Sequence, residues 1–238
     1  RGISGLGDRK TPREICDMLV NDIAVIQLHV DAADPKQLRS VRPAATIVDE
    51  YITDLEKGIG QTVPTGIADL DYALAGGPAT GEMVIIASRP SQGKTMLALQ
   101  IADQLTERGE KCLLLSEEMS FRLVGKRLLK RITSLGEDVW DNSINKLRDD
   151  AYAWRQGREQ FYVSRPCGTI AKAVQTIERA ARDGVQCVFV DYAQLLRGQG
   201  NGMYEQCSDV SMRLRELTSA HELVLFCLCQ LSRKSEEH

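Results

Sequence analysis

Met83-Val84-Ile85-Ile86-Ala87-Ser88-Arg89-Pro90-Ser91-Gln92-Gly93-Lys94-Thr95 is the stretch that decides the fold of this chain. Its apolar start predicts a buried strand, and the residues after Thr95 predict a helix with one apolar face. That face consists of Leu97, Ala98, Ile101, Ala102 and Leu105. A strand, a Gly-Lys-Thr loop and a helix in this order indicate a P-loop, whose backbone N–H groups and helix N-terminus bind phosphate.

The loop residues are therefore the candidates for holding a nucleotide. They are Arg89, Pro90, Ser91, Gln92, Gly93, Lys94 and Thr95. Lys94 is expected to reach the β- and γ-phosphates of ATP, and the Thr95 hydroxyl to take one place on Mg²⁺. Ser88 stands where the generic pattern has its first glycine. The alternative is an ordinary strand–turn–helix whose loop happens to read Gly-Lys-Thr.

Composition bounds the class of protein. The 238 residues are 43% hydrophobic and 26% charged, which is typical of a soluble domain with an accessory segment. The net charge of −3 does not indicate a nucleic-acid binder, although local contacts shared by several subunits are compatible with it. No apolar run reaches the length of a membrane span, so we expect no membrane partner. Seven scattered cysteines without a Cys-x-x-Cys predict neither a disulfide framework nor a zinc site, and favour a reducing cytoplasm.

The pattern along the chain predicts three parts. Residues 1–42 contain a helix that begins at Thr11-Pro12, and residues 43–64 are expected to form a linker helix and a flexible connection. The apolar face of the linker helix packs either on its own domain or on a neighbouring subunit, and periodicity does not distinguish the two. From residue 65 to 238, strands alternate with helices near 93–107, 120–134, 143–157, 169–182 and 204–220. The predicted strands are Met83–Ala87, Cys112–Ser116, Phe161–Val163, Cys187–Val190 and Leu223–Leu228. This order predicts an α/β, doubly wound, mostly parallel sheet.

Polar residues follow several of these strands. Asp191 ends Val188-Phe189-Val190, as expected of a carboxylate that holds Mg²⁺ through its waters. Glu117 and Glu118 follow another apolar strand, so one of them either orients an attacking water or is an ordinary charge at a helix start. Gln230 ends the last strand, where it either contacts a γ-phosphate or is a simple polar residue at a strand end.

Taken in order, these motifs resemble the RecA-like ATPase domain of DnaB-type replicative hexameric helicases, bacterial or phage. The matching segments are Thr65-Gly66 with Leu70-Asp71, Gly76-Gly77, Gly81-Glu82, Arg89–Thr95, Ser116-Glu117-Glu118-Met119, Asp191-Tyr192-Ala193-Gln194-Leu195 and Gln230-Leu231-Ser232-Arg233. The family typically reads Ser-Leu-Glu-Met where this chain has Ser116–Met119. It also often has a small residue other than glycine at the position of Ser88.

The resemblance implies roles for individual residues. Glu118 matches the catalytic glutamate, Asp191 the magnesium-side acid, Gln230 the phosphate sensor, and Arg127 an arginine near the nucleotide. The segment 197–208 matches a loop that follows single-stranded DNA in the central channel, although it also reads as an ordinary surface loop. Its candidate DNA contacts are Arg197, Gly198, Gln199, Gly200, Asn201 and Gly202. The linker helix matches one that docks on the adjacent subunit of a ring.

The resemblance also implies an activity and partners. We expect an ATP- and Mg²⁺-dependent helicase motor that forms a ring, a hexamer in the family, and that meets single-stranded DNA, a primase and a loader. The alternatives are a RecA-like recombinase or clock-type ATPase, and a nucleotide-gated assembly or loader module. Met212 departs from the family, which has an arginine there. The family's last strands and trans-acting arginine finger would lie beyond His238, so slow hydrolysis is expected of this piece alone.

Overall fold

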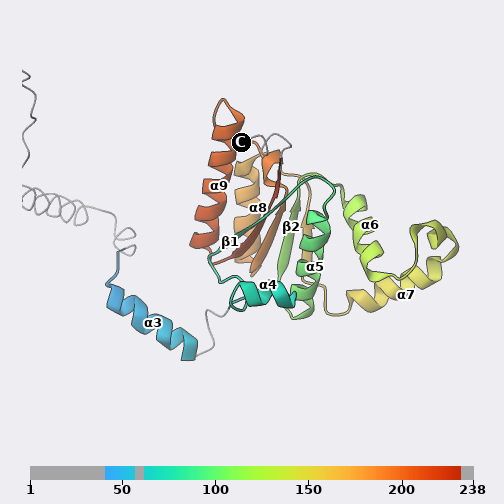
Figure 1. Cartoon of the computed structure of the whole chain (residues 1–238), viewed down its shortest axis with the longest axis horizontal. Coiled ribbons are helices and arrows are strands. Elements are labelled where there is room, and N and C mark those ends of the chain that lie inside the picture. The colour runs from blue at the N-terminus through green and yellow to red at the C-terminus, as the bar shows by residue number, and fades with distance from the viewer. Residues whose placement is uncertain (1–40, 57–61, 232–238) are drawn as a thin grey trace, which may run out of the picture. The chain divides into compact units, whose positions relative to one another are not determined.

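The computed structural model describes residues 41–56 and 62–231, which fall into two compact units divided after Ile59 (Figure 1). In the first unit, helix α3 runs from Ala44 to Glu56, within the range predicted for a linker helix. The helix predicted from Thr11, most of the connection before Pro64, and the Ser232-Arg233 pair lie outside the described residues.

The second unit is built on a five-stranded, wholly parallel sheet. Its strands lie in the order β1-β5-β4-β2-β3. The strand bounds are β1 Met83–Ser88, β2 Cys112–Ser116, β3 Phe161–Ser164, β4 Cys187–Asp191 and β5 Val224–Gln230. The predicted α/β fold with a parallel sheet is therefore confirmed, and the described sheet contains no antiparallel strand.

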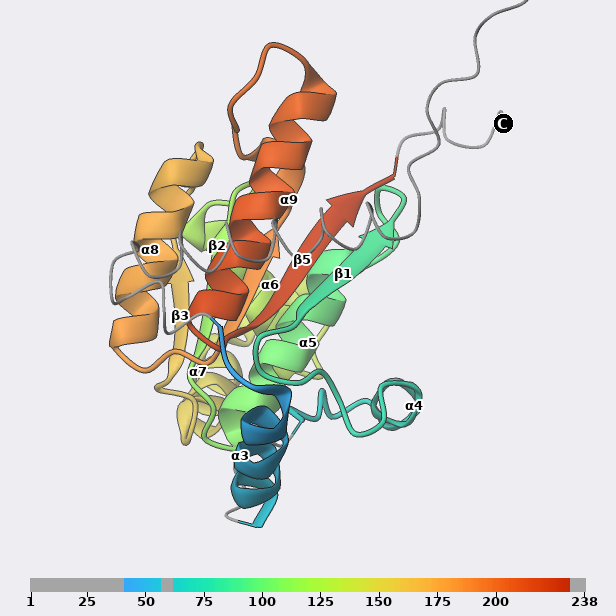
Figure 2. The ribbon, with the colours of Figure 1, turned by 90° about the vertical axis from the view of Figure 1, so that its left-hand side faces the viewer.

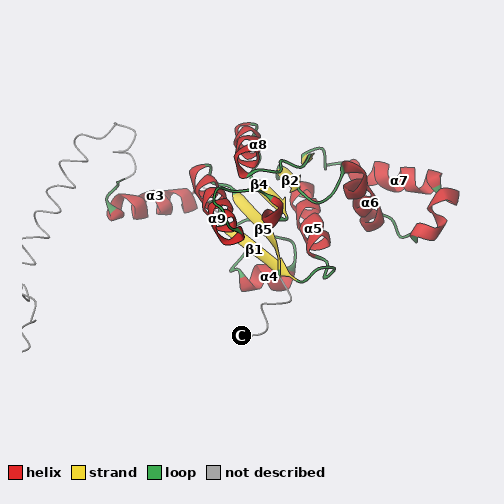
Figure 3. Cartoon of the chain, turned by 90° about the horizontal axis from the view of Figure 1, so that it is seen from above, coloured by secondary structure: helices red, strands yellow, loops and turns green. Residues whose placement is uncertain are grey.

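Helices cover both faces of this sheet. Helix α5 lies on one face, and α8 and α9 lie side by side on the other (Figures 1 and 2). Seen from above, α6 and α7 lie beyond α5, away from the strands (Figure 3). The helix bounds are α4 Ala68–Ala73, α5 Lys94–Glu107, α6 Phe121–Ile132, α7 Ile144–Arg155, α8 Ile170–Arg182 and α9 Met203–Ala220. The short α4 and the 3₁₀ turns Glu137–Asn142 and Ala193–Leu195 were not predicted, because they are too short to show a period.

The core explains why the strands read as continuous apolar runs. Every residue of β2 and β4 is buried, since helices pack on both of their faces. At the centre, the rings of Phe189 and Phe226 stack with their centroids 4.6 Å apart. The predicted apolar face of α5 packs against this side of the sheet through Ala98, Ile101 and Leu105. Each large side chain buried here contributes about 1.5–3 kcal/mol to folding.

Hydrogen bonds to one acid stabilise the turn that precedes the first strand of the sheet. Asp71 of α4 accepts hydrogen bonds from the backbone N–H of Thr65 at 2.6 Å and of Gly66 at 3.0 Å, and from the Thr65 hydroxyl at 2.7 Å. The first matching segment of the sequence is thus a structural turn that precedes the strands.

The described residues also bear on the expectations for membrane spans and disulfides. Among the described helices, none is long and apolar enough to cross a membrane. Within the same residues the cysteines are free thiols.

Candidate nucleotide-binding site

The carboxyl ends of four parallel strands meet at one edge of the sheet, and a pocket of about 300 Å³ opens there. Loops that follow such ends are where α/β proteins place ligands. The pocket is lined by Pro90, Ser91, Gly93, Lys94, Thr95, Glu118, Arg127, Asp191, Tyr192 and Gln230. All of these except Tyr192 are residues that the sequence predicted for the site. Arg89 and Gln92 are exposed residues of the same loop but do not line the pocket.

The loop between β1 and α5 has the backbone of a phosphate cradle. Gly93 precedes α5 with a φ of +89°, which favours glycine, and Ser91 has a φ of +62°. Lys94 folds back over the loop, and its Nζ donates to the carbonyl oxygens of Ser88 at 3.1 Å and Arg89 at 3.4 Å. Ser88 is the last residue of β1 and pairs with Gln230. Because its backbone is extended, the glycine of the generic pattern is not required at this position.

Thr95 and Asp191 are the two buried residues among those that line the pocket. The Thr95 hydroxyl donates a hydrogen bond of 2.8 Å to Oδ2 of Asp191, which is only 1% exposed. The other carboxylate oxygen, Oδ1, is buried and meets no hydrogen-bond donor among the described residues. Burial raises the pKa of Asp191, and the Thr95 hydrogen bond opposes this. The Glu118 charge raises the same pKa further, whereas Arg127 and Lys94 lower it.

These two residues fit a hard divalent cation. Mg²⁺ prefers oxygen ligands. The pocket offers an unpaired, buried carboxylate oxygen beside a hydroxyl, and the P-loop lines the same pocket. A cation there would also satisfy an oxygen that otherwise carries an uncompensated desolvation cost.

The structure separates the two acids after β2. Glu118 is exposed and lines the pocket. Glu117 is buried and points elsewhere, since its carboxylate accepts hydrogen bonds from the backbone N–H groups of Cys167 and Gly168. Only Glu118 is therefore placed to act on a bound nucleotide.

Gln230 reaches the pocket from the end of β5 and is held there by a residue that the sequence analysis did not single out. The side-chain amide of Gln194 accepts from the Gln230 backbone N–H at 3.2 Å and donates to the Gln230 carbonyl oxygen at 3.2 Å. The only signal in the sequence was the position of Gln194 in the segment that follows Asp191.

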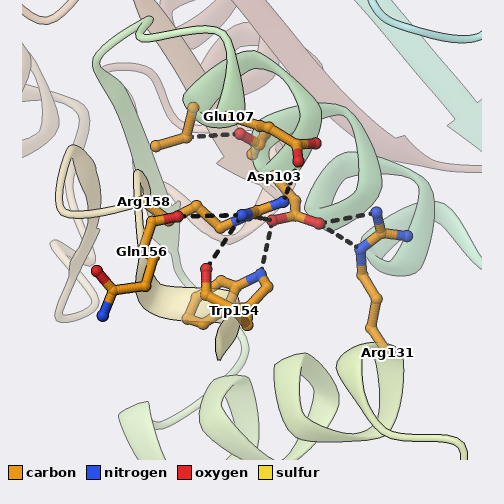
Figure 4. Close-up of polar contacts among 8 residues, drawn as sticks. Asp103, Glu107, Arg131, Trp154, Gln156 and Arg158 are labelled. Carbon is orange, nitrogen blue, oxygen red and sulfur yellow. Dashed lines mark hydrogen bonds and ion pairs between the residues drawn. The ribbon is translucent and has the colours of Figure 1, made fainter. Parts of the chain in front are cut away.

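Arg127 comes to the pocket on helix α6, and a buried carboxylate holds that helix (Figure 4). Asp103 of α5 is 5% exposed and accepts from Arg131 of α6 at 2.9 Å. Its other oxygen accepts from Trp154 Nε1 at 2.7 Å and Arg158 Nε at 2.6 Å. Asp103 thus ties α5, α6 and α7 together. No pattern in the sequence indicated Asp103, because a single acid in a helix does not indicate partners that are distant in sequence.

Two lysines of the basic helix α6 pair with an acid outside the pocket. Lys126 and Lys130 form ion pairs with Glu137, and the Lys130 pair is 3.2 Å long. These surface lysines therefore lie outside the pocket, as expected of a solvated face, whereas Arg127 lines it.

The candidate DNA loop lies outside the pocket, between β4 and α9. Two of its backbone N–H groups are bound by carboxylates of α9: Gln199 donates to Asp209 at 2.7 Å, and Asn201 donates to Glu205 at 2.8 Å. The Gln199 N–H lowers the pKa of Asp209, and Arg213 adds to this. Arg197, Gln199 and Asn201 are exposed, and Met212 is an exposed residue farther along α9.

The model of the DnaB-like helicase C terminal domain family matches residues 62–238. A "Probable plasmid replicative DNA helicase" of Chlamydia trachomatis serovar L2 is 32% identical over 187 residues, which cover 73% of this chain and 40% of that protein. This chain therefore spans about 40% of the length of that curated relative.

Solved structures show the same fold. One of them, described as an ATPase domain, superposes with a TM-score of 0.72 at 22% identity, covering 83% of this chain and 74% of that one. "The Structure Of A DnaB-Like Replicative Helicase And Its Interactions With Primase" gives a TM-score of 0.65 at 22% identity, covering 93% and 59%. The sheet is thus that of RecA-like helicase ATPase domains, and the chain belongs to the DnaB-like helicase C-terminal domain family.

Proposed function

We propose that this chain is the ATPase motor domain of a replicative DNA helicase, which hydrolyses ATP to move along single-stranded DNA and unwind duplex. The observation that carries the proposal is the pocket in which Lys94, the Thr95–Asp191 pair, Glu118 and Gln230 converge from four strand ends. Family membership supports the same activity.

Each residue has a distinct role in this proposal. The P-loop N–H groups and Lys94 bind the phosphates of ATP, and Lys94 offsets negative charge as the γ-phosphate departs. Glu118 orients and polarises the attacking water. Thr95 and Asp191 hold Mg²⁺, which neutralises phosphate charge when bound. Arg127 adds positive charge at the mouth of the pocket, and Gln230 senses the γ-phosphate.

A helicase motor domain of this kind has DNA and protein partners. The loop Arg197–Gly202 contacts the phosphates of single-stranded DNA, so affinity should fall steeply with salt. The domain works in a ring of identical subunits, a hexamer, in the bacterial cytoplasm or in a phage-infected host. A primase and a loader are further partners. One structural neighbour, described as a DnaB-like replicative helicase with its interactions with primase, supports the primase.

Binding and hydrolysis of ATP test the proposal at the pocket. Lys94→Ala should weaken ATP binding strongly, and Glu118→Gln should keep binding while hydrolysis falls by roughly 10²–10⁴. Lys111→Ala is the matched control, because Lys111 is a surface lysine that donates to the Asp183 carbonyl away from the pocket. ATP affinity of the Lys94→Ala protein equal to that of the Lys111→Ala protein would contradict the proposal.

Unwinding of a forked duplex by the protein that contains this chain tests the second step. Unwinding that requires Lys94 supports a helicase. Filament formation on DNA without unwinding would indicate a recombinase instead, and ATP binding without either would indicate an assembly or loader module.

A further inference from the structure

Glu117 is a buried acid that the proposed hydrolysis does not use. The residue is 9% exposed, and Oε1 accepts from the Cys167 N–H at 2.9 Å while Oε2 accepts from the Gly168 N–H at 2.8 Å. Both bonds are charge-assisted, and together they fix the position of the loop between β3 and α8. Gly168 has a φ of +70°, a conformation that lets its N–H turn toward the acid.

The same loop is joined on its other side to the candidate DNA loop. The carbonyl oxygen of Gly168 accepts from the Arg197 N–H at 3.2 Å, and the Ile170 N–H donates to the Arg197 carbonyl oxygen at 3.0 Å. Thr169 and Arg197 thus form an isolated parallel bridge. Hydrogen bonds at both sides of residues 167–170 therefore connect Glu117, through the backbone of that segment, to the first residue of the loop Arg197–Gly202.

The near end of this chain lies at the nucleotide pocket. The Glu117 N–H donates to the Asp191 carbonyl oxygen at 2.8 Å, and Ser116 pairs with Asp191 in the sheet. Glu118, which lines the pocket, is the next residue. A shift of the backbone at Glu118 or Asp191 on nucleotide binding would move the Glu117 carboxylate and the loop bonded to it.

The contact depends on the two acceptor oxygens of the Glu117 carboxylate. A leucine accepts no hydrogen bond, so it could not hold the N–H groups of Cys167 and Gly168. The polar connection to residues 167 and 168 therefore requires an acceptor side chain at position 117.

We infer that Glu117 is a positioning residue that links the nucleotide pocket to the DNA-binding loop through the backbone of residues 167–170. The inference rests on the proposed function for the identity of the two ligands. It assigns to Glu117 a coupling role and leaves the hydrolytic chemistry to Glu118.

Amide hydrogen exchange tests the connection without any ligand. In Glu117→Gln, one side-chain acceptor becomes an NH₂ group facing a backbone N–H, so Cys167 and Gly168 should exchange faster. The decisive reporters are the N–H groups of Ile170 and Arg197, which should exchange about tenfold faster or more, corresponding to loss of about one hydrogen bond. Glu82→Gln is the matched control, because Glu82 is an exposed acid that also accepts from a backbone N–H, that of Ala79. Unchanged exchange at Ile170 and Arg197 overturns the inference.

Glu117→Leu provides a variant that removes the polar side chain altogether, so that no side-chain NH₂ group faces the backbone N–H groups of Cys167 and Gly168. It should show the same faster exchange at Arg197, while the amides of β4 and β5 keep their protection. Faster exchange throughout β4 and β5 of Glu117→Leu, matching that at Arg197, would show a merely structural role and overturn the inference.

The functional readout is the affinity for an oligo-dT strand measured with and without a non-hydrolysable ATP analogue and Mg²⁺. The ratio of the two dissociation constants measures the coupling between the sites, and it is independent of hydrolysis. Glu117→Leu should bring this ratio toward one by a factor of about 2–30, with the affinity for the analogue unchanged. A ratio equal to that of the unmodified chain overturns the inference. If the unmodified chain binds neither ligand, the proposed function fails, and exchange at Arg197 still decides whether Glu117 holds the loop.

Discussion

The Thr95 hydroxyl donates a hydrogen bond of 2.8 Å to Oδ2 of Asp191, and this contact joins residues 96 positions apart in the sequence. It brings the end of β4 to the first turn of α5 and leaves the other oxygen of Asp191 without a donor among the described residues. This pair is the proposed magnesium site, and the first two predictions concern it.

Thr95→Val keeps the shape of the side chain and removes its oxygen. We expect ATP hydrolysis to need at least about tenfold more Mg²⁺, because one oxygen that holds the ion or its ligands is lost. A titration of activity with Mg²⁺ measures this. Thr95→Ser retains the hydroxyl and should need about as much Mg²⁺ as the unmodified chain. Equal Mg²⁺ requirements for the valine and serine variants would contradict the assignment.

The raised pKa of Asp191 predicts a pH-dependent stability in the absence of Mg²⁺ and nucleotide. Burial is the main cause of the raised pKa, so ionised Asp191 destabilises the fold. A group whose pKa is raised on folding favours the folded state at low pH, and this contribution is lost as pH rises through the folded pKa. The stability of Asp191→Asn relative to the unmodified chain should therefore be greatest near neutral pH and decrease toward acid. Urea unfolding at several pH values measures the difference, in which other titrating groups cancel. A difference that grows as pH falls would contradict this prediction.

Asp103 is expected to contribute far more to stability than its neighbour Glu107, although both contact Arg158. Asp103→Ala leaves the half-buried Arg158 and Trp154 donors without this acceptor, so it should cost about 1.5–3 kcal/mol of unfolding free energy. The Glu107 side chain is 61% exposed, so Glu107→Gln should cost less than about 1 kcal/mol. Denaturant unfolding compares the two variants. Similar losses in both would show that the cluster in Figure 4 does not hold α6 and α7 as described.

Gln194 is expected to act on hydrolysis through Gln230. Gln194→Ala removes both hydrogen bonds to the Gln230 backbone, so the sensor side chain should lose its fixed position. In the protein that contains this chain, we expect kcat to fall by roughly tenfold while KM for ATP changes little, because the phosphate cradle is intact. Steady-state kinetics separate the two constants. Gln194→Glu keeps an acceptor for the Gln230 N–H but loses the donor to the Gln230 carbonyl oxygen. The kcat of this variant should lie between those of the unmodified protein and Gln194→Ala. A rise in KM with kcat unchanged would instead place Gln194 in nucleotide binding.

Local patterns predicted most of the fold. Each predicted strand is present within a few residues, because continuous apolar runs between helical periods have few other structures available. The P-loop is predictable for the same reason, since a short segment contains the strand, the glycine and the helix start. Its one irregularity, Ser88, is explained by the extended backbone at the end of β1.

The order of residues was enough to predict the strands, the longer helices of the sheet domain and the polar residues that end the strands, because these depend on neighbours within a few positions. The directions of the side chains at those ends depend instead on packing in three dimensions. Packing turns Glu118 into the pocket and Glu117 toward Cys167 and Gly168, a distinction that the strand pattern left open and that only the resemblance had predicted. It also sets the partners of Asp103 and Gln194, since these bonds join segments that only the assembled helices and strands bring together.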